Sequence, residues 1–259
     1  MLRERGVSES LLSLLSGDGR RAVVVLEAYL DESGTDNTSR IVAVACYAAT
    51  HDEWMAFEHQ WQPVLDAAGI DCFHGKESRC DRLRPALTEN INSRRVQGLV
   101  MWVGQDDFGK AGQRFKQTLG NAYSVCAFGC ALQMAAWSKE NGHGQVAFVL
   151  EDGQANVEFV RATLEDMIGD DAFNVAAVAV AKKRAFVPLQ AADFLSHCVS
   201  TGDRIWLERL LGDGYGRALS GQLTGDKLTE LAASADEAWR QHRYRKHQAK
   251  LARGRALSR

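Results

Sequence analysis

The sequence has few prolines, no long apolar run and no marked excess of charge of either sign. Its 259 residues include only three prolines, and 46% are hydrophobic, which is typical of a globular chain with a sizeable core. The formal net charge of -2 gives no overall basic character of the kind that binds polyanions. No apolar run reaches membrane-spanning length. The apolar run within residues 1–20 is too short and too interrupted for a signal peptide. We therefore expect a cytoplasmic protein without a membrane partner.

The six cysteines lack the Cys-x-x-Cys spacing that marks many redox and zinc motifs. Several lie in apolar stretches, which favours reduced thiols in the core of a cytoplasmic protein. Cys72, His74 and Cys80 are close enough in sequence to suggest a zinc site. Their spacing is irregular and a fourth ligand is not evident, so zinc remains the minor alternative.

Charge is distributed unevenly, with an acidic body and a basic C-terminal segment. Residues 240–259 hold eight Lys and Arg and no Asp or Glu, whereas the rest of the chain holds 33 acidic and 23 basic residues. Such a segment can follow the phosphate backbone of a nucleic acid, and it can equally be a solvated tail. We predict a basic helix or tail over residues 236–259, whose candidate nucleic-acid contacts are Arg243, Arg245, Lys246 and Lys250.

The hydrophobic pattern predicts alternating strands and helices after an N-terminal leader of residues 1–20. Runs rich in β-branched residues mark the strands, and apolar residues at helical spacing mark the helices. The region after residue 200 has a helical pattern. The predicted strands are 22–31, 40–49, 94–104, 145–153 and 173–183, and the predicted helices are 50–69, 80–92, 115–140, 155–169 and 188–200.

This order of elements predicts one α/β domain over residues 21–235. The short polar connection between the first two strands favours an antiparallel hairpin, and the later strand–helix–strand units favour parallel crossovers. The order is that of a ribonuclease H-like fold. We expect a mixed five-stranded sheet flanked by helices, with a helical insertion between strands two and three.

Acidic residues stand where predicted strands end. Asp31 ends the first strand, Glu151 and Asp152 end the fourth, and Asp193 borders the packed face of helix 188–200. An acid at a strand end is commonly a solvated turn residue. In an open sheet, however, functional groups collect at the carboxyl ends of strands, and converging carboxylates suit hard divalent cations. Two such ions about 4 Å apart can activate water and stabilise the leaving oxygen of a phosphodiester.

Four motifs resemble the family called domain of unknown function 3800, over residues 25–200. They are "YLDESGT", "FHGKES", "PLQAADFLSH" and, more weakly, "FVLEDG". The resemblance implies a ribonuclease H-like fold with an acidic centre that binds Mg²⁺ or Mn²⁺. It also implies an activity on nucleic acid, RNA or DNA, in a mobile-element or defence context.

The resemblance places Asp31, Glu151 and Asp193 as metal ligands and catalytic carboxylates. Asp152 competes with Glu151, because neighbouring residues of a strand point to opposite faces. By the same parity, Glu32 faces away from the site if Asp31 faces it, unless the strand bulges.

Further residues near the motifs have two readings each. His74 either orients water, transfers a proton or contacts phosphate, or it packs or caps as a loop histidine. Lys183 either neutralises phosphate or is a solvated strand exit, and Gln190 either binds a ligand or caps its own helix. The ribonuclease H plan commonly has an acid on its first long core helix, whereas helix 115–140 has only Glu140, at its end. Glu77, which lies near His74, and His74 itself are candidates to replace that acid.

Two functions therefore follow from the sequence. The first is a metal-dependent nuclease, or a related phosphoryl-transfer enzyme, with Asp31, Glu151, Asp193 and His74 as its catalytic residues. The second is a catalytically inactive module that binds nucleic acid or a protein partner. Loss of metal binding would favour the second.

Overall fold

The computed structural model describes residues 26–36, 38–110, 113–211, 218–231 and 233. Six strands among these residues join in one mixed sheet. They are β1 (Leu26–Ser33), β2 (Ile41–Ala49), β3 (Gln97–Gly104), β4 (Val146–Glu151), β5 (Val175–Ala181) and β6 (Ala218–Gln222). The predicted start of the first strand, residues 22–25, and the basic segment 236–259 lie outside the described residues.

The spatial order of the strands is β5-β4-β1-β2-β3-β6. β1, β2 and β3 form an antiparallel meander, in which Asp31 lies opposite Ala45. β4 runs parallel to β1 on its other side, and β5 runs parallel to β4. The carboxyl ends of β1, β4 and β5 therefore meet at one edge of the sheet. This arrangement confirms the predicted ribonuclease H-like fold class.

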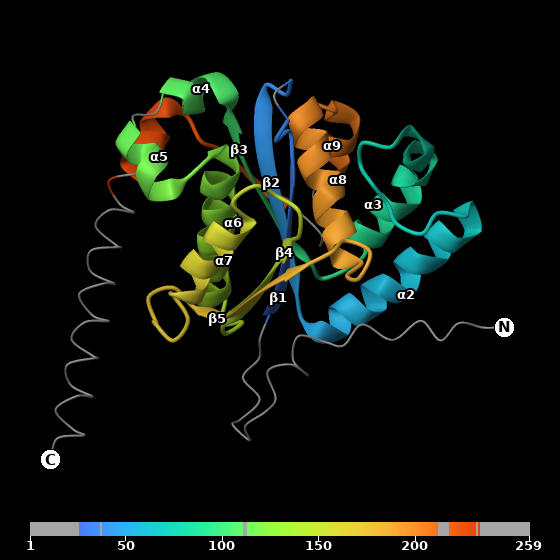
Figure 1. The fold of residues 1–259 in the computed structure, drawn as a ribbon. Coiled ribbons are helices and arrows are strands. Elements are labelled where there is room, and N and C mark those ends of the chain that lie inside the picture. The colour runs from blue at the N-terminus through green and yellow to red at the C-terminus, as the bar shows by residue number, and fades with distance from the viewer. Residues whose placement is uncertain (1–25, 37, 111–112, 212–217, 232, 234–259) are drawn as a thin grey trace, which may run out of the picture.

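Helices cover both faces of the sheet, which stands edge-on between them in Figure 1. α6 (Ala122–Glu140) and α7 (Val157–Glu165) pack on one face around Leu30 and Phe148. α8 (Pro188–Thr201) and α2 (His51–Ala68) pack on the other around Tyr29 and Val149. Further helices are η1 (Ser78–Leu83), α3 (Arg84–Asn92), α4 (Gln105–Lys110), α5 (Gln113–Leu119) and α9 (Arg204–Leu210), and residues 225–231 are also helical.

The sequence accounts closely for α2, the first helix of the insertion. The side chain of Thr50 caps it by accepting a hydrogen bond from the Glu53 N–H at 3.5 Å, and Gly69 ends it in the left-handed region at φ 67°. The side chains that recur at helical spacing are buried: Trp54, Phe57, Trp61 and Leu65. These aromatic residues belong to the core.

Two predicted helices are each divided in the structure. The helix expected over 115–140 is interrupted at Gly120, which has φ 79°, and Asn121 begins α6 by accepting the Ser124 N–H at 2.9 Å. The helix expected over 80–92 starts as the 3₁₀ turn η1 and becomes α-helical at Arg84, where Pro85 fits the first turn. A capping asparagine and a first-turn proline therefore set where the two α-helices begin, within continuous apolar patterns.

The helical pattern expected after residue 200 is correct for α9 and for residues 225–231, and wrong for β6. β6 pairs in parallel with β3, so the sheet has a sixth strand that the sequence did not predict. Its "ALSGQ" sequence lacks the β-branched residues that mark the other strands. Within the described ranges, no helix combines the length and apolar character needed to cross a membrane.

Candidate metal centre

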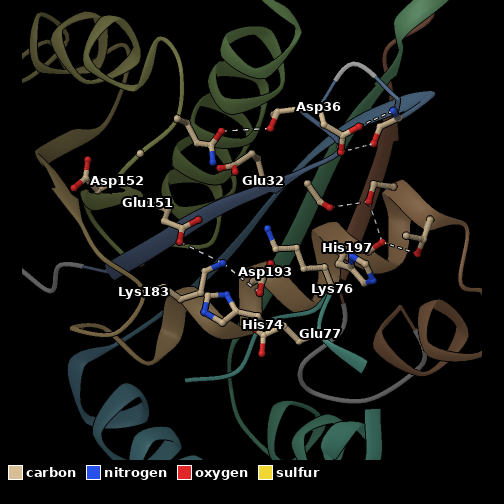
Figure 2. Close-up of a pocket in the computed structure, with 18 residues that line it drawn as sticks. Glu32, Asp36, His74, Lys76, Glu77, Glu151, Asp152, Lys183, Asp193 and His197 are labelled. Atoms are coloured by element: carbon tan, nitrogen blue, oxygen red, sulfur yellow. Dashed lines mark hydrogen bonds and ion pairs between the residues drawn. The ribbon is translucent and has the colours of Figure 1, made fainter. Parts of the chain in front are cut away.

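The carboxyl ends of β1 and β4 open into a pocket of about 680 Å³, shown in Figure 2. α8 and the loop between α2 and η1 complete its walls. The pocket is strongly acidic, although the loop and β5 each bring a lysine. Its charged lining residues are Glu32, Asp36, Glu77, Glu151, Asp152 and Asp193 among the acids, with Lys76 and Lys183.

Asp31 and Glu32 leave β1 on opposite faces of the sheet, as strand parity requires. Asp31 follows Tyr29 on the α8 face, and Glu32 follows Leu30 on the α6 face. Because both stand at the end of the strand, one carboxylate oxygen of each still lies within 4.8 Å of the other and of a Glu151 oxygen. The prediction that Glu32 points away from the site is therefore wrong for its carboxylate.

Glu151, and not Asp152, joins this group of three carboxylates. Glu151 is the last residue of β4 and is partly buried, whereas Asp152 is exposed at the pocket rim. The Asp152 N–H donates to the carbonyl of Ala181 at 2.8 Å, which continues the β4–β5 pairing past the strand. This pairing leaves Glu151 directed at the end of β1.

Asp193 lies beside this group but is not one of its three members, so its predicted role as a metal ligand stays a prediction. Its Oδ2 accepts a hydrogen bond from the Gly75 N–H at 2.8 Å and lies 3.2 Å from Lys183 Nζ. These two contacts hold Asp193 on the loop side of Asp31. Glu32 takes its place in the tight group.

The ammonium group of Lys183 lies among three carboxylates. Its Nζ is 2.7 Å from Asp31 Oδ2, 3.3 Å from Glu151 Oε1 and 3.2 Å from Asp193 Oδ2. Only 7% of Lys183 is exposed, so it is not a solvated strand exit, and it lines the pocket. Burial lowers the pKa of Lys183, but Asp31, Asp193 and Glu151 outweigh it and hold that pKa above its ordinary value. Lys183 is therefore charged at neutral pH.

The acids of the group are costly to ionise. Burial raises the pKa of Asp31 well above its ordinary value, and Glu151, Glu32 and Asp193 add to the effect while Lys183 opposes it. Burial and the Glu151 charge raise the pKa of Glu32 to about 8, again against Lys183. The site thus has more carboxylates than its one ammonium can keep ionised. A bound divalent cation would relieve this repulsion and replace the protons.

The "FHGKES" loop brings His74, Lys76 and Glu77 to the pocket. Figure 2 shows the Lys76 side chain extending toward the middle of the pocket. Glu77 is held by Arg79, which lowers its pKa, and it does not join the carboxylate group. His74 and Lys76 therefore supply the loop's nitrogen groups to the site.

Gly75 is clamped between two charged side chains. Its N–H donates to Asp193 Oδ2, and its carbonyl accepts a hydrogen bond from the buried Arg84 at 3.0 Å. A Cβ at this position would lie 2.7 Å from the Cβ of His197, so only glycine fits. The loop that carries His74 is therefore fixed to α8.

Gln190 has a structural role in the same clamp and does not line the pocket. Its Oε1 accepts hydrogen bonds from the Phe73 N–H at 2.9 Å and from Trp61 Nε1 at 3.0 Å. Neither predicted role, as ligand contact or as helix cap, uses this oxygen. Gln190 instead ties the loop and α2 to α8.

Sequence reasoning missed His197, which lines the pocket from α8. It stands four residues after Asp193, and that spacing places both on one face of a helix. Burial lowers the pKa of His197, partly offset by Asp193, so the imidazole is neutral at neutral pH. The helical spacing was the signal that could have found it. The predicted nucleic-acid contacts Arg243, Arg245, Lys246 and Lys250 lie outside the described residues.

Comparisons with known proteins return similar structures and no similar sequences. No protein-family model matches the chain, and no curated protein matches it. RNase HII of Archaeoglobus fulgidus, from its complex with PCNA, aligns with a TM-score of 0.43 and 17% identity, covering 74% of this chain and 82% of that one. Bst-RNase HIII in complex with Mn²⁺ gives 0.42 and 16%, covering 74% and 58%. Aquifex aeolicus RNase H3 gives 0.41 and 14%, covering 74% and 62%.

Proposed function

We propose that this protein is a divalent-metal-dependent nuclease that hydrolyses phosphodiester bonds in nucleic acid. The observation that carries the proposal is the group of Asp31, Glu32 and Glu151, whose oxygens lie within 4.8 Å of one another beside an open pocket. Carboxylate oxygens are the ligands that Mg²⁺ and Mn²⁺ prefer.

The residues fit such an ion by a second criterion. Glu32 is 8% exposed, and its buried Oε2 has no hydrogen-bond partner among the residues that the structure describes. A buried carboxylate oxygen without a partner is costly unless a ligand satisfies it. Asp31, Glu32 and Glu151 would hold the ion, which would supply an activated water and neutralise charge on the phosphate.

The chain's own nitrogen groups would handle the substrate. An acidic pocket repels a phosphate, so a cationic side chain has to offset that field. Lys76 extends into the pocket and would bind a phosphate oxygen (Figure 2). His74 lines the same pocket and would move a proton to or from an oxygen of the reacting phosphodiester. Gly75 between them fixes both positions.

We also propose that the chain is a member of the domain of unknown function 3800 family. All four motifs that carry the resemblance contribute to one pocket, through Glu32, His74, Glu151 and Asp193. The four motifs are far apart in sequence, yet their residues meet in one pocket. This convergence supports the view that the pocket has the same origin as the site of that family.

Cleavage of labelled single-stranded, duplex and hybrid nucleic acids with Mg²⁺ or Mn²⁺ tests the nuclease. We expect cleavage by the wild type and a loss of about 100-fold or more in cleavage rate in Asp31→Asn and Glu32→Gln. Loss of a residue that hydrogen-bonds to a metal ligand costs about 10–100-fold, and loss of a ligand itself should cost more. Asp171→Asn is the matched control, since this exposed acid lies before β5, at the other end of that strand. Activity that survives Asp31→Asn would contradict the proposal.

A second function is favoured by the ion pairs of Lys183, which already neutralise part of the acidic site. In that case the protein is an inactive module that binds nucleic acid or a partner. A wild type that cuts none of the substrates and binds no Mn²⁺ by calorimetry would establish this alternative against the nuclease.

A further inference from the structure

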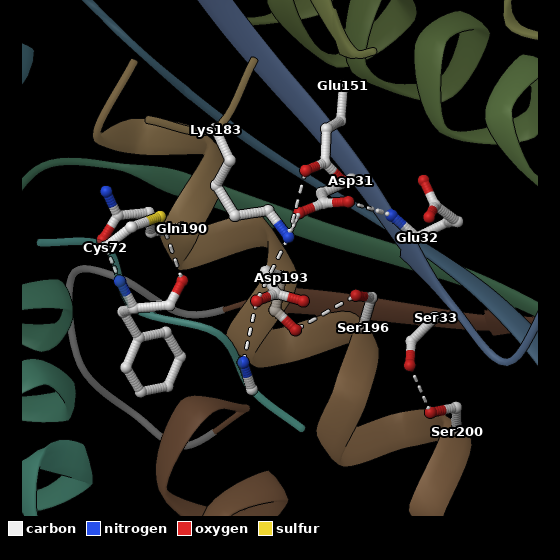
Figure 3. A network of polar contacts seen from close by, with 12 residues as sticks. Asp31, Glu32, Ser33, Cys72, Glu151, Lys183, Gln190, Asp193, Ser196 and Ser200 are labelled. Carbon is white, nitrogen blue, oxygen red and sulfur yellow. Dashed lines mark hydrogen bonds and ion pairs between the residues drawn. The ribbon is translucent and has the colours of Figure 1, made fainter. Parts of the chain in front are cut away.

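The carboxylates of Asp31 and Glu151 each lie between two sets of neighbouring side chains. On one side both carboxylates contact the Lys183 ammonium, through Asp31 Oδ2 at 2.7 Å and Glu151 Oε1 at 3.3 Å. The same two residues also form the tight group with Glu32. Figure 3 shows Lys183 and Glu32 on opposite sides of Asp31. Two carboxylates therefore bridge two positions for positive charge.

Carboxylates shared between two cation positions are the arrangement of two-metal hydrolytic sites, in which the ions are about 3.5–4 Å apart. Here one of the two positions holds a lysine nitrogen. Asp193, on the Lys183 side, completes that position with its Oδ2 at 3.2 Å from Nζ. Glu32, on the other side, completes the second position and has a buried oxygen without a hydrogen-bond partner in the described ranges.

We propose that Lys183 is a built-in replacement for one of two metal ions, so that the protein binds a single divalent cation between Asp31, Glu32 and Glu151. The inference rests on the proposed function for the presence of that cation. An ammonium group has three N–H donors, and three carboxylates surround this one. Lys183 therefore balances part of the negative charge of these carboxylates.

The charge of the site fits one ion better than two. Four carboxylates, Asp31, Glu32, Glu151 and Asp193, face the single ammonium of Lys183, which leaves three negative charges when all are ionised. One divalent ion reduces this excess to one. A second ion would make the site positive and would compete with Lys183 for the same buried oxygens. Displacing Lys183 would break all three of its ion pairs.

Mn²⁺ titration of the metal-free full chain, followed by calorimetry and electron paramagnetic resonance, tests the stoichiometry. We expect one Mn²⁺ per wild-type chain, with the spectrum of an isolated ion. Lys183→Met removes the ammonium and keeps the length of the side chain, and we expect it to bind two Mn²⁺ with a spin-coupled spectrum. Lys182→Met is the matched control, because Lys182 precedes Lys183 and is exposed. It should bind one ion.

Two Mn²⁺ bound to the wild type, or one bound to Lys183→Met, would overturn the replacement while leaving the metal site in place. A wild type that binds no Mn²⁺ would overturn the proposed function and the inference together. These outcomes separate the two proposals because the number of bound ions is read without any measurement of cleavage.

Chemical labelling of the wild type keeps the test open if Lys183→Met does not fold. Reductive dimethylation modifies accessible lysines, and mass spectrometry locates them. We expect Lys182 to be modified and Lys183 to stay protected, both without metal and at saturating Mn²⁺. Modification of Lys183 only when Mn²⁺ is present would show that the ion displaces it, and the inference would be wrong.

Discussion

The two ends of β1 each bury acidic side chains, and they differ in what surrounds them. At the start of the strand, Glu27 is 2% exposed and accepts the Tyr29 hydroxyl at 2.9 Å, with His51 Nδ1 at 3.4 Å from its other oxygen. Trp54 covers it and donates to its carbonyl. At the far end, the Lys183 ammonium lies against Asp31, Glu151 and Asp193, and Glu32 stands beside Asp31 at an open pocket.

The comparison shows that a buried acid alone does not mark a metal site. One Glu27 oxygen accepts the Tyr29 hydroxyl and the other has only His51 Nδ1 at 3.4 Å, and Glu27 does not line the pocket. The site at the far end has more carboxylates than donors and an opening to solvent. The surplus of carboxylates, together with access to solvent, is what distinguishes a candidate centre from an enclosed core residue.

The largest effect that we predict on stability belongs to the far end. Without metal, Lys183→Met should lower the free energy of unfolding by about 3–5 kcal/mol, because it leaves buried carboxylates without their counter-ion. Urea unfolding measures the loss, and added Mn²⁺ should restore part of it. Lys182→Met should unfold like the wild type. Equal stability of the two variants would mean that the ion pairs of Lys183 contribute nothing.

A smaller effect is expected at the closed end. Tyr29→Phe removes the hydroxyl that donates to Glu27 Oε2 and keeps the ring, which contacts Trp54 edge-on at 5.2 Å. We expect a loss of about 1–3 kcal/mol in unfolding free energy, since a buried carboxylate oxygen loses its donor. Mn²⁺ affinity should not change. A tenfold weaker affinity would show that the two ends of β1 are coupled.

The smallest effect concerns Glu58, which lies near Glu27. Burial and the Glu27 charge raise the pKa of Glu58 to about 7, against an opposing effect of His51. The native state therefore holds this proton more tightly than the unfolded state, and stability falls as the pH rises from about 4.5 through 7. Glu58→Gln should raise the unfolding free energy at pH 8, because it removes a carboxylate that is unfavourable to ionise in the native state. The gain should be only about 1 kcal/mol, because solvent screens this partly exposed group.

At pH 5 the same substitution should have a much smaller effect, because Glu58 is protonated in the native state and the unfolded state has only begun to ionise. Thermal unfolding at both pH values measures the difference between variant and wild type. A gain of equal size at pH 5 would contradict an ionisation effect and would indicate a change in packing.

The fold could be predicted from the sequence because each strand and helix has its own local pattern, and these patterns recur along the chain. The acids Asp31 and Glu151 follow apolar strands, and the order of strands and helices restricts where those strand ends can meet. The N-cap of α2 at Thr50 was also readable, since its partner is three residues away. Signals of this kind need no knowledge of packing.

The remaining features depend on contacts between distant segments. Lys183 appeared to be a strand exit because nothing near it in sequence shows that Asp31 and Asp193 surround it. Glu32 was placed by strand parity, which holds inside a sheet and fails at a strand end, where a long side chain can turn back. Gln190 was assigned to its own helix, whereas its partners lie in α2 and the "FHGKES" loop.

β6 has a consequence for the behaviour of the chain in concentrated solution. It covers the outer edge of β3, whose sequence "QGLVMWVG" is apolar and has no charged residue. An uncovered apolar edge strand offers unpaired backbone groups to other molecules and is a starting point for aggregation. A chain shortened before Ala218 would expose that edge, so the strand that the sequence did not predict protects the sheet from self-association.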